Sequence, residues 1–363
     1  MASEAVRVAI VGGGVAGLVV GRVLQSSARH SVVVFDAGRA PGGRIGSFWN
    51  EADEIGFDYG SPILPSSSLL SSSLPECLSS SWEEAAAEIS APWTPSGATG
   101  EALVGLPEAR SFVHWLGSGV EVVSSTSVGR LAREAESGKW RVESKEGADL
   151  GEFDVVALAT QPSVVQGLAE GAGLDDAAGA AGRVETEATW VGMFQFAEDD
   201  VSIARAVASA AASVGGLSVE DGILRVGNTG DPGLPFPLKV ILHEGAKPGR
   251  GKGSVVAHAL PKWAHDNFST PKAEVASIMS AALQEALGLG PPVLAKAHRW
   301  SKSRCIPASS PGVDAFWSPD LSAGVCGDWC LGDGILNAIR SGSALASRIM
   351  SDSPPAVDSK SKL

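Results

Sequence analysis

The stretch VRVAIVGGGVAGLVVGRVLQSSARHSVVVFD, residues 6–36, decides the fold. Its apolar run at 6–11 predicts a strand buried on both faces, and a turn of three glycines follows. Apolar residues at helical spacing then predict a helix over 15–26, and a second apolar run predicts a buried strand over 31–35. A strand, a helix and a strand in this order form one βαβ unit of a parallel sheet, so the predicted fold class is α/β.

The glycines of this turn follow the pattern G-x-G-x-x-G. In such a turn the first glycine allows the bend, the second lets a pyrophosphate approach the backbone, and the third lets helix and strand pack closely. The free amides and positive dipole end of the helix favour the pyrophosphate, and the acid that ends the second strand suits the adenosine ribose. The pattern predicts dinucleotide binding rather than a merely glycine-rich turn. The candidate contacts are Gly12, Gly14, Val15, Ala16, Gly17, Asp36 and Ala37.

Two further motifs resemble the superfamily of FAD-dependent amine oxidases, renalases and phytoene desaturases. One is APGGR at 40–44, directly after the acid, and the other is GDWCLGDGILNAIRSG at 327–342. The resemblance is closest to the renalases and covers most of the chain, although 167–291 matches only in its strand pattern. It implies a Rossmann-like FAD-binding domain, an inserted α+β substrate domain on a mixed or antiparallel sheet, and FAD held without a covalent bond.

The same resemblance implies roles for residues of these motifs. Arg44 would lie beside the diphosphate, the alternative being a surface charge. Asp328 would bind the ribityl chain, the alternative being a helix N-cap, and the helix that follows would point its N-terminus at the pyrimidine end of the flavin. The segment at 56–61 resembles one that passes near the flavin ring. The other implied contacts are Gly43, Gly60, Ser61, Val128, Thr160, Pro162, Gly327, Gly334, Ile335, Leu336 and Ala338.

Composition shifts and apolar runs predict several domains. The predicted FAD-binding domain is discontinuous and takes 1–64, 103–168 and 295–350. A Ser/Pro-rich insertion takes 65–102, and its part at 65–81 is predicted to be an irregular loop or poorly ordered. The substrate domain takes 169–294, and a flexible tail takes 351–363. Further strands are predicted at 120–133, 139–144, 154–159, 188–196, 222–227, 238–243, 255–260, 295–300 and 324–326, and further helices at 204–213, 271–287 and 335–350.

No acid–base pair or triad is visible in the sequence. None is required when a substrate delivers its hydride directly to a flavin, so the catalytic residues stay unknown. Lys239 is a candidate for holding a water near the flavin or is a solvated strand lysine, and Trp329 packs near the flavin or in the core. His243 and His258 lie on consecutive predicted strands, and they are a base and a recognition group or ordinary buried histidines.

Composition excludes several other chemistries. A net charge of −13, from 41 acids and 28 bases, would repel a nucleic-acid backbone. The four cysteines lack a CxxC pair and accompanying histidines, so no metal site is expected, and a thioether from Cys305 or Cys330 to the flavin is a minor alternative. The single tyrosine, Tyr59, rules out a two-tyrosine cage for an amine. No stretch is long and apolar enough to predict a membrane span.

The sequence predicts an oxidoreductase that takes a hydride from a small donor, of the dihydronicotinamide type or an amine, and passes electrons to dioxygen, which gives hydrogen peroxide. The alternatives are a dehydrogenase or desaturase with another acceptor, and a non-catalytic flavin-binding protein. The final tripeptide Ser361-Lys362-Leu363 matches a peroxisomal address and predicts binding to the peroxisomal import receptor. If the tail is not recognised, a cytoplasmic location is expected.

Overall fold

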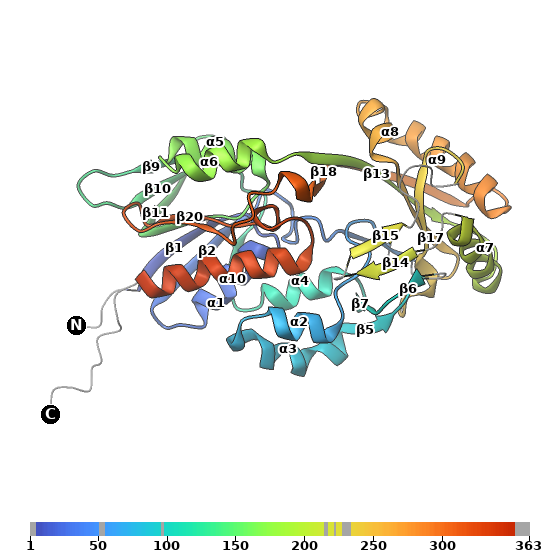
Figure 1. Ribbon diagram of the computed structural model, residues 1–363, viewed down its shortest axis with the longest axis horizontal. Helices are drawn as coiled ribbons and strands as arrows, with labels where there is room; N and C mark the ends of the chain where they lie inside the picture. The colour runs from blue at the N-terminus through green and yellow to red at the C-terminus, as the bar shows by residue number, and fades with distance from the viewer. Residues whose placement is uncertain are drawn as a thin grey trace.

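The computed structural model describes residues 5–50, 55–95, 98–213, 217–220, 223–226 and 234–352. These residues form two units side by side along the long axis of the molecule (Figure 1). The first unit is built on a six-stranded sheet of order β19-β20-β12-β1-β2-β8, and the second on a four-stranded sheet of order β16-β17-β13-β18. Helices cover both sheets, so the α/β class predicted from the sequence is confirmed.

The six-stranded sheet is parallel except at one edge, where β19 runs antiparallel to β20. Its strands are β1 (Val6–Val11), β2 (His30–Phe35), β8 (Glu121–Val123), β12 (Val155–Leu158), β19 (Phe316–Ser318) and β20 (Ala323–Val325). Along β1, Val8 and Ile10 enter one core, while Ala9 and Val11 enter the core on the opposite face. Burial on both faces explains why the strand is apolar at every position but one.

Figure 1 shows helices on both sides of this sheet. On one side, α1 (Val15–Gln25) packs along α10 (Ile335–Asp352), with α4 (Arg110–Leu116) beside α1. The predicted helices at 15–26 and 335–350 are therefore confirmed. The other side is covered by a second, antiparallel sheet and two helices. These are β9 (Val128–Arg133), β10 (Trp140–Ser144), β11 (Asp149–Phe153), α5 (Pro162–Gly171) and α6 (Asp175–Arg183).

The serine-rich segment folds as two helices, so the loop predicted over 65–81 is wrong. They are α2 (Ser67–Ser73) and α3 (Glu76–Ile89). Leu70, Leu74, Leu78 and Trp82 recur every four residues and are buried in the same core as α1. This apolar stripe decides the conformation, because serine itself has only an average helix propensity. The hairpin of β5 (Ser90–Trp93) and β7 (Ala102–Gly105) follows.

The second unit matches the sequence prediction closely. Its sheet contains β13 (Thr186–Gln195), β16 (Leu238–His243), β17 (Ser254–Ala259) and β18 (Leu294–Cys305), all antiparallel to their neighbours. One face of this sheet packs against α7 (Asp200–Ser213), α8 (Pro261–Asp266) and α9 (Lys272–Leu287). The opposite face is turned toward the first unit, where Val191 and Val256 contact Phe57.

Two predicted boundaries between the units are corrected. The boundary at 168/169 falls inside α5, and α5 and α6 both bury their apolar faces in the core of the first unit. The chain therefore leaves the first unit after α6, at the start of β13. Residues 295–305 were assigned to the FAD-binding domain, but they form β18, which pairs with β13 over its whole length. Apolar content alone did not distinguish a strand of one sheet from a strand of the other.

The remaining elements are short. They are β3 (Ser47–Asn50) and β4 (Ile55–Asp58), which pair, β6 (Ala98–Thr99), β14 (Leu217–Glu220) and β15 (Ile223–Val226), which form a small sheet, and the 3₁₀ turns η1 (Glu244–Ala246), η2 (Pro307–Ser309) and η3 (Asp328–Cys330). β15 corresponds to the predicted strand at 222–227, whose two ends lie outside the described residues, as does the C-terminal tripeptide. Within the described ranges, no helix has the length and apolar character needed to cross a bilayer.

Candidate functional site

Almost all the residues predicted to contact the cofactor line one cavity of about 620 Å³. It opens at the carboxyl ends of β1 and β2, passes the start of α10, and ends against the four-stranded sheet of the second unit. Every residue predicted to contact the cofactor lines this cavity except Gly17 and Leu336. The two exceptions are buried in the first unit, in helices α1 and α10. Their backbone shapes the site without forming its surface.

The glycine turn is fixed by Asp36. The two carboxylate oxygens of Asp36 accept hydrogen bonds from the amides of Gly13 and Gly38, each at 2.7 Å. Gly12 has a φ of 111°, and a Cβ atom there would lie 2.5 Å from the carbonyl oxygen of Ala159. A carboxylate has about four lone-pair positions, so Asp36 retains the capacity to bind a ribose hydroxyl while it holds the turn.

Gly14 differs from the other glycines of the turn. It precedes α1 with a φ of −77°, and no side chain caps the helix. A Cβ atom at Gly14 would have only the Cα of Gly43 nearby, at 4.0 Å, so it would point into the cavity. Val15 and Ala16, the first residues of α1, line the same cavity, and no side chain in the described part of the chain caps this helix end. Together they form a cradle for an anionic group such as a diphosphate.

The two ends of the chain meet across this cavity. Arg44 forms one ion pair with Asp328, the first residue of η3. It forms a second with Asp333, whose Oδ1 atom lies 3.2 Å from Nη1 of Arg44. Burial alone would lower the pKa of Arg44, but the two carboxylates outweigh it and raise the pKa. Burial raises the pKa of Asp333 to about 6, with Arg44 opposing and Asp328 adding to the rise. The cluster therefore ties the segment after β2 to the start of α10.

Asp333 was not predicted as a site residue. Its only sequence signal is its position five residues after Asp328 and directly before the closing helix. Asp333 also lies 3.8 Å from the guanidinium of Arg304 on β18. Sequence reasoning could not supply this contact, because Arg304 comes from the second unit.

Four polar atoms of cavity-lining residues are shielded from solvent and lack a hydrogen-bond partner among the described residues. Oε2 of Glu187 and Nε of Arg304 face each other at 3.7 Å in an ion pair, whereas Oγ1 of Thr160 and Nε2 of His258 have no such contact. Burial lowers the pKa of His258 to about 4, and Lys239 and Lys247 add to this effect, so its ring is neutral at pH 7. Buried polar groups are normally paired, so these two atoms indicate that a polar ligand completes the site.

The three catalytic candidates lie in different surroundings. Lys239 and Trp329 line the cavity, and Trp329 donates from Nε1 to the carbonyl of Thr160 at 3.2 Å. His243 does not line it, so a role for His243 at this site is wrong. It is buried at the far end of β16, with Nε2 3.2 Å from Asp200 of α7. Its position at the end of β16 turns its ring toward α7 and away from the cavity.

The cysteines near the cavity are buried and stay protonated at neutral pH. Burial raises the pKa of Cys305 to about 12 and that of Cys330 to about 12. Only Cys305 lines the cavity. A thioether to a flavin requires a reactive thiolate, which neither cysteine provides at neutral pH. Among the residues that the structure describes, no group of three or more His, Cys, Asp or Glu side chains has the arrangement of a metal site.

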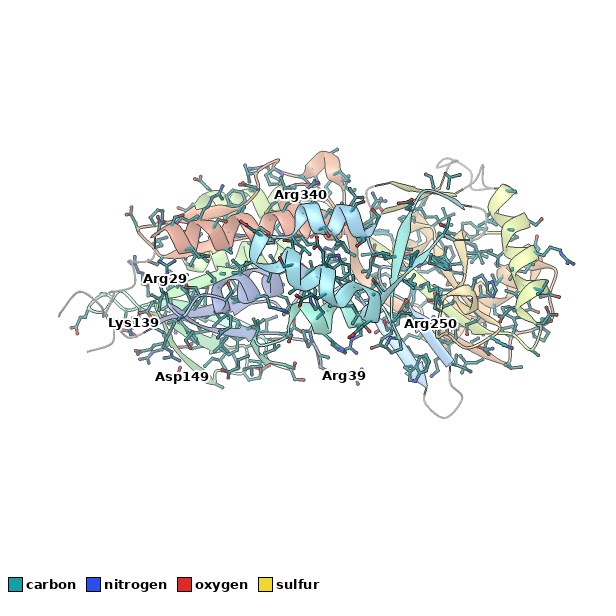
Figure 2. The ribbon with its side chains drawn as sticks, turned by 90° about the horizontal axis from the view of Figure 1, so that it is seen from below. Arg29, Arg39, Lys139, Asp149, Arg250 and Arg340 are labelled. Atoms are coloured by element: carbon teal, nitrogen blue, oxygen red, sulfur yellow. The ribbon has the colours of Figure 1, made fainter. Side chains whose placement is uncertain are left out.

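The segment at 56–61 contributes to the cavity and also to a buried ionic cluster beside it. Gly60 and Ser61 line the cavity as expected, but the side chain of Asp58 points away from it. Asp58 lies 3.1 Å from Lys247 and 2.6 Å from Arg250, and Lys247 lies 2.5 Å from Glu244. All four of these side chains are fully buried. Figure 2 labels Arg250 where this ionic cluster joins the two units.

This ionic cluster predicts a pH dependence of stability. Burial raises the pKa of Glu244 from 4.5 to about 7, although Lys247 favours its ionised form. The folded chain then binds a proton that the unfolded chain releases, so the contribution of Glu244 to the free energy of unfolding is expected to increase as the pH falls from about 7 to about 4.5. The slope is at most about 1.4 kcal/mol per pH unit. Urea denaturation of the wild type and of Glu244→Gln isolates this contribution: the wild type should gain stability relative to the variant as the pH falls across this range. A difference between the two proteins that does not change with pH contradicts the assignment.

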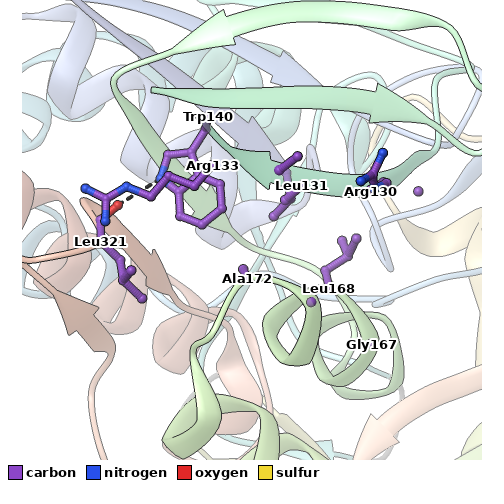
Figure 3. Close-up of a pocket in the computed structure, with 11 residues that line it drawn as sticks. Arg130, Leu131, Arg133, Trp140, Gly167, Leu168, Ala172 and Leu321 are labelled. Atoms are coloured by element: carbon purple, nitrogen blue, oxygen red, sulfur yellow. Dashed lines mark hydrogen bonds between the residues drawn. The ribbon is translucent and has the colours of Figure 1, made fainter. Parts of the chain in front are cut away.

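A second, smaller cavity of about 310 Å³ lies between β9, β10 and α5 (Figure 3). Arg130, Leu131 and Leu168 are part of its lining. At one end the indole of Trp140 donates to the carbonyl of Leu321 at 2.8 Å. None of the predicted contact residues lies here, so the larger cavity is the candidate site.

Comparisons with known proteins agree with this geometry. A family model for an NAD(P)-binding Rossmann-like domain matches residues 10–72, the segment that carries the glycine turn, Asp36 and Arg44. A cyclohexylamine oxidase from Brevibacterium oxydans IH-35A superposes with a TM-score of 0.68 at 12% identity, over 96% of this chain and 99% of its own. The chain has the fold of that oxidase.

Two further solved structures share the fold at 12% identity. One is a candidate protoporphyrinogen oxidase from Exiguobacterium sp. 255-15, with a TM-score of 0.66 over 97% of this chain and all of its own. The other is an oxidoreductase from Methanosarcina mazei, with a TM-score of 0.58 over 94% of this chain and all of its own. Near-complete coverage on both sides means that the second unit, as well as the Rossmann-type segment, belongs to the shared architecture.

Proposed function

We propose that this chain is an FAD-dependent oxidoreductase that holds its cofactor without a covalent bond. The observation that carries the proposal is that Gly14 and Asp328, far apart in the sequence, line one continuous cavity. The cavity volume of about 620 Å³ lies within the usual range for cofactor and ligand sites. The open cradle at Gly14, the unpaired Thr160 hydroxyl and the carboxylates at Asp36 and Asp328 fit the diphosphate and the hydroxyl groups of a flavin nucleotide.

The residues of this chain bind and orient the cofactor in the proposed account. Asp36 would accept hydrogen bonds from the adenosine ribose while it holds the turn, and the start of α1 would receive the diphosphate. Asp328 would bind the ribityl chain, and the N-terminus of α10 would stabilise negative charge on the pyrimidine side. FAD supplies the two-electron chemistry when it is bound. The sheet of the second unit closes the far end and limits access of water to the donor.

The finer part of the proposal concerns the reaction. We place the chain among oxidases of the renalase or amine-oxidase type, which take a hydride from a small donor and release hydrogen peroxide after reaction with dioxygen. The sequence resemblance supports this choice. The C-terminal Ser361-Lys362-Leu363 supports a peroxisomal location, where a peroxide-forming enzyme is accommodated. The electron donor would approach from the side of β13, β16 and β17, since residues of all three strands line the cavity.

The decisive experiment for the reaction is anaerobic stopped-flow mixing of the flavin-loaded protein with amines and with reduced nicotinamides, followed by exposure to air. The proposal expects at least one donor to bleach the flavin absorbance, and air to restore it with formation of hydrogen peroxide. Bleaching without recovery in air would assign a dehydrogenase with another acceptor. Absence of bleaching by every donor would favour a flavin-binding protein without catalysis.

Arg44→Gln is expected to weaken FAD retention roughly tenfold or more, because charge-assisted contacts of this kind contribute about 1.5–3 kcal/mol. The variant leaves Asp328 and Asp333 without their shared cation, and the two carboxylates then repel each other beside the cofactor. Equilibrium dialysis with FAD measures the effect. Arg130→Gln is the matched control, since Arg130 is 68% exposed and pairs with Glu143 at the surface. Equal FAD affinity in both variants contradicts the role of Arg44.

A further inference from the structure

The second unit contributes one wall of the cavity, and the charges on this wall are unequal. Its sheet turns alternate side chains toward the helices and toward the first unit, as strand geometry requires. The charged side chains on the cavity side are Lys239 from β16, Lys302 and Arg304 from β18, and Glu187 from β13. Three cations therefore face one acid.

The carboxylates near this wall already form ion pairs with arginines. Glu187 lies 3.7 Å from Arg304, which also lies 3.8 Å from Asp333. Asp333 and Asp328 are paired with Arg44 on the opposite side of the cavity. Lys239 and Lys302 form no ion pair with any residue in the described part of the chain, although Glu187 favours the charged form of Lys239 from a longer distance.

Local backbone geometry directs Lys239 into this space. The ladder between β16 and β17 shifts register between Leu238 and Val240, and the consecutive residues Lys239 and Val240 both line the cavity. A bulge of this kind re-aims a side chain that would otherwise alternate to the other face. Burial lowers the pKa of Lys239, Arg304 lowers it further, and Glu187 opposes the two only in part, so the lysine lies in an environment that penalises its charge. An anionic ligand would remove that penalty.

The neighbouring His258 gives an independent indication. Its Nε2 atom is buried at the same wall and has no hydrogen-bond partner among the described residues. An uncharged ring nitrogen next to an ammonium group is a suitable partner for an oxygen atom of a ligand. The wall thus offers two cations without an ion pair and the unpaired Nε2 of His258, beside the Glu187–Arg304 ion pair, whose buried Oε2 and Nε atoms form no hydrogen bond among the described residues.

We propose that the donor oxidised at this site carries an oxyanion, a carboxylate or a phosphate, which Lys239 and Lys302 bind. The proposal rests on the proposed function, because it takes this end of the cavity as the donor site. It also selects among donors: a simple alkylammonium ion would meet two lysines without ion pairs, and Glu187, the acid of this wall, already faces Arg304. An amine without an acidic group is therefore a poor donor.

The test uses three probes of nearly equal shape with the oxidised, flavin-loaded protein: benzoate, benzamide and benzylamine. Their dissociation constants come from the change in the flavin absorption spectrum at low ionic strength. Benzoate is expected to bind roughly tenfold tighter than benzamide, in line with the usual strength of charge-assisted contacts, and benzylamine weakest. Inorganic phosphate as a competitor separates the two oxyanions: displacement of benzoate assigns a site that accepts both, and no displacement assigns a carboxylate site.

The variants locate the effect. Lys239→Gln and Lys302→Gln are each expected to reduce the preference for benzoate over benzamide at least threefold, while Lys262→Gln leaves it unchanged. Lys262→Gln is the matched control, because this substitution removes the same charge from a side chain on α8 that is 88% exposed. Tightest binding of benzylamine, or an undiminished benzoate preference in both cavity variants, would overturn the proposal. A folded chain that binds no FAD contradicts the proposed function alone; a flavin-loaded chain without benzoate preference contradicts the oxyanion site alone.

Discussion

Gly14→Val is expected to give a folded protein that has lost its FAD. The backbone of Gly14, at φ −77° and ψ 179°, is allowed for valine, and the added carbon atoms would occupy the cavity instead of striking the protein. That space is the one assigned to the diphosphate, so FAD affinity should fall roughly 100-fold or more, equivalent to about 2.7 kcal/mol. Flavin absorbance of the purified protein and calorimetric titration with FAD measure the loss, and circular dichroism checks the fold.

Gly17→Ala separates the two uses of glycine in the same turn. A Cβ atom at Gly17 would lie 2.0 Å from the carbonyl oxygen of Gly12, so the strand and helix must move apart. This variant is expected to lose ~1–3 kcal/mol of unfolding free energy. Gly14→Val should lose little stability and most of the flavin, whereas Gly17→Ala should lose stability first. Stoichiometric flavin in Gly14→Val would contradict the position assigned to the diphosphate.

Asp58→Asn is expected to destabilise the fold by ~3–5 kcal/mol. The carboxylate of Asp58 is fully buried, and it contacts Lys247 and Arg250 and accepts hydrogen bonds from Ser47 and the amide of Ala109. The amide keeps the shape but removes the negative charge, which leaves two buried cations with only Glu244. Burial alone would raise the pKa of Asp58, but Lys247 and Arg250 outweigh it and lower the pKa to about 2. The stabilisation is present above 3.8, the ordinary pKa, and is lost as the pH falls toward 2.

Urea denaturation at neutral pH measures this effect. Asp266→Asn is the matched control, because Asp266 forms an exposed ion pair with Lys262 and should lose less than ~1 kcal/mol. If the two variants lose the same amount, the buried cluster does not hold the units together in the way its geometry indicates. The cluster involves β4 and η1, so its failure is expected to loosen the contact between the units before it unfolds either sheet.

The parts of the fold that the sequence predicted are those with local patterns. β1, α1 and β2 follow from an apolar run, a glycine turn and a second run, and the strand at 238–243 and the helix at 271–287 have clear periodicity. Helices α2 and α3 were missed because serines fill the positions between Leu70, Leu74 and Leu78, and their composition is typical of a loop. The stripe of leucines was the available signal.

The site residues that the sequence predicted are likewise those that lie in local motifs. Gly14, Arg44 and Asp328 lie in motifs whose residues are adjacent in the sequence, and all three line the cavity. The second wall could not be predicted, because Lys302 and Glu187 face the cavity only through the register between β18 and β13. Likewise, the cationic partners of Asp58, Lys247 and Arg250, lie 189 and 192 residues away in the loop after η1, and the packing of the two units brings them to the carboxylate.

The most direct test of the account is a crystal structure of the chain grown with FAD. The account predicts one flavin nucleotide per chain, with density for the diphosphate over Gly14 and for the ribityl chain beside Asp328. A structure in which FAD lies outside this cavity, or in which the cavity stays empty at saturating FAD, would contradict it.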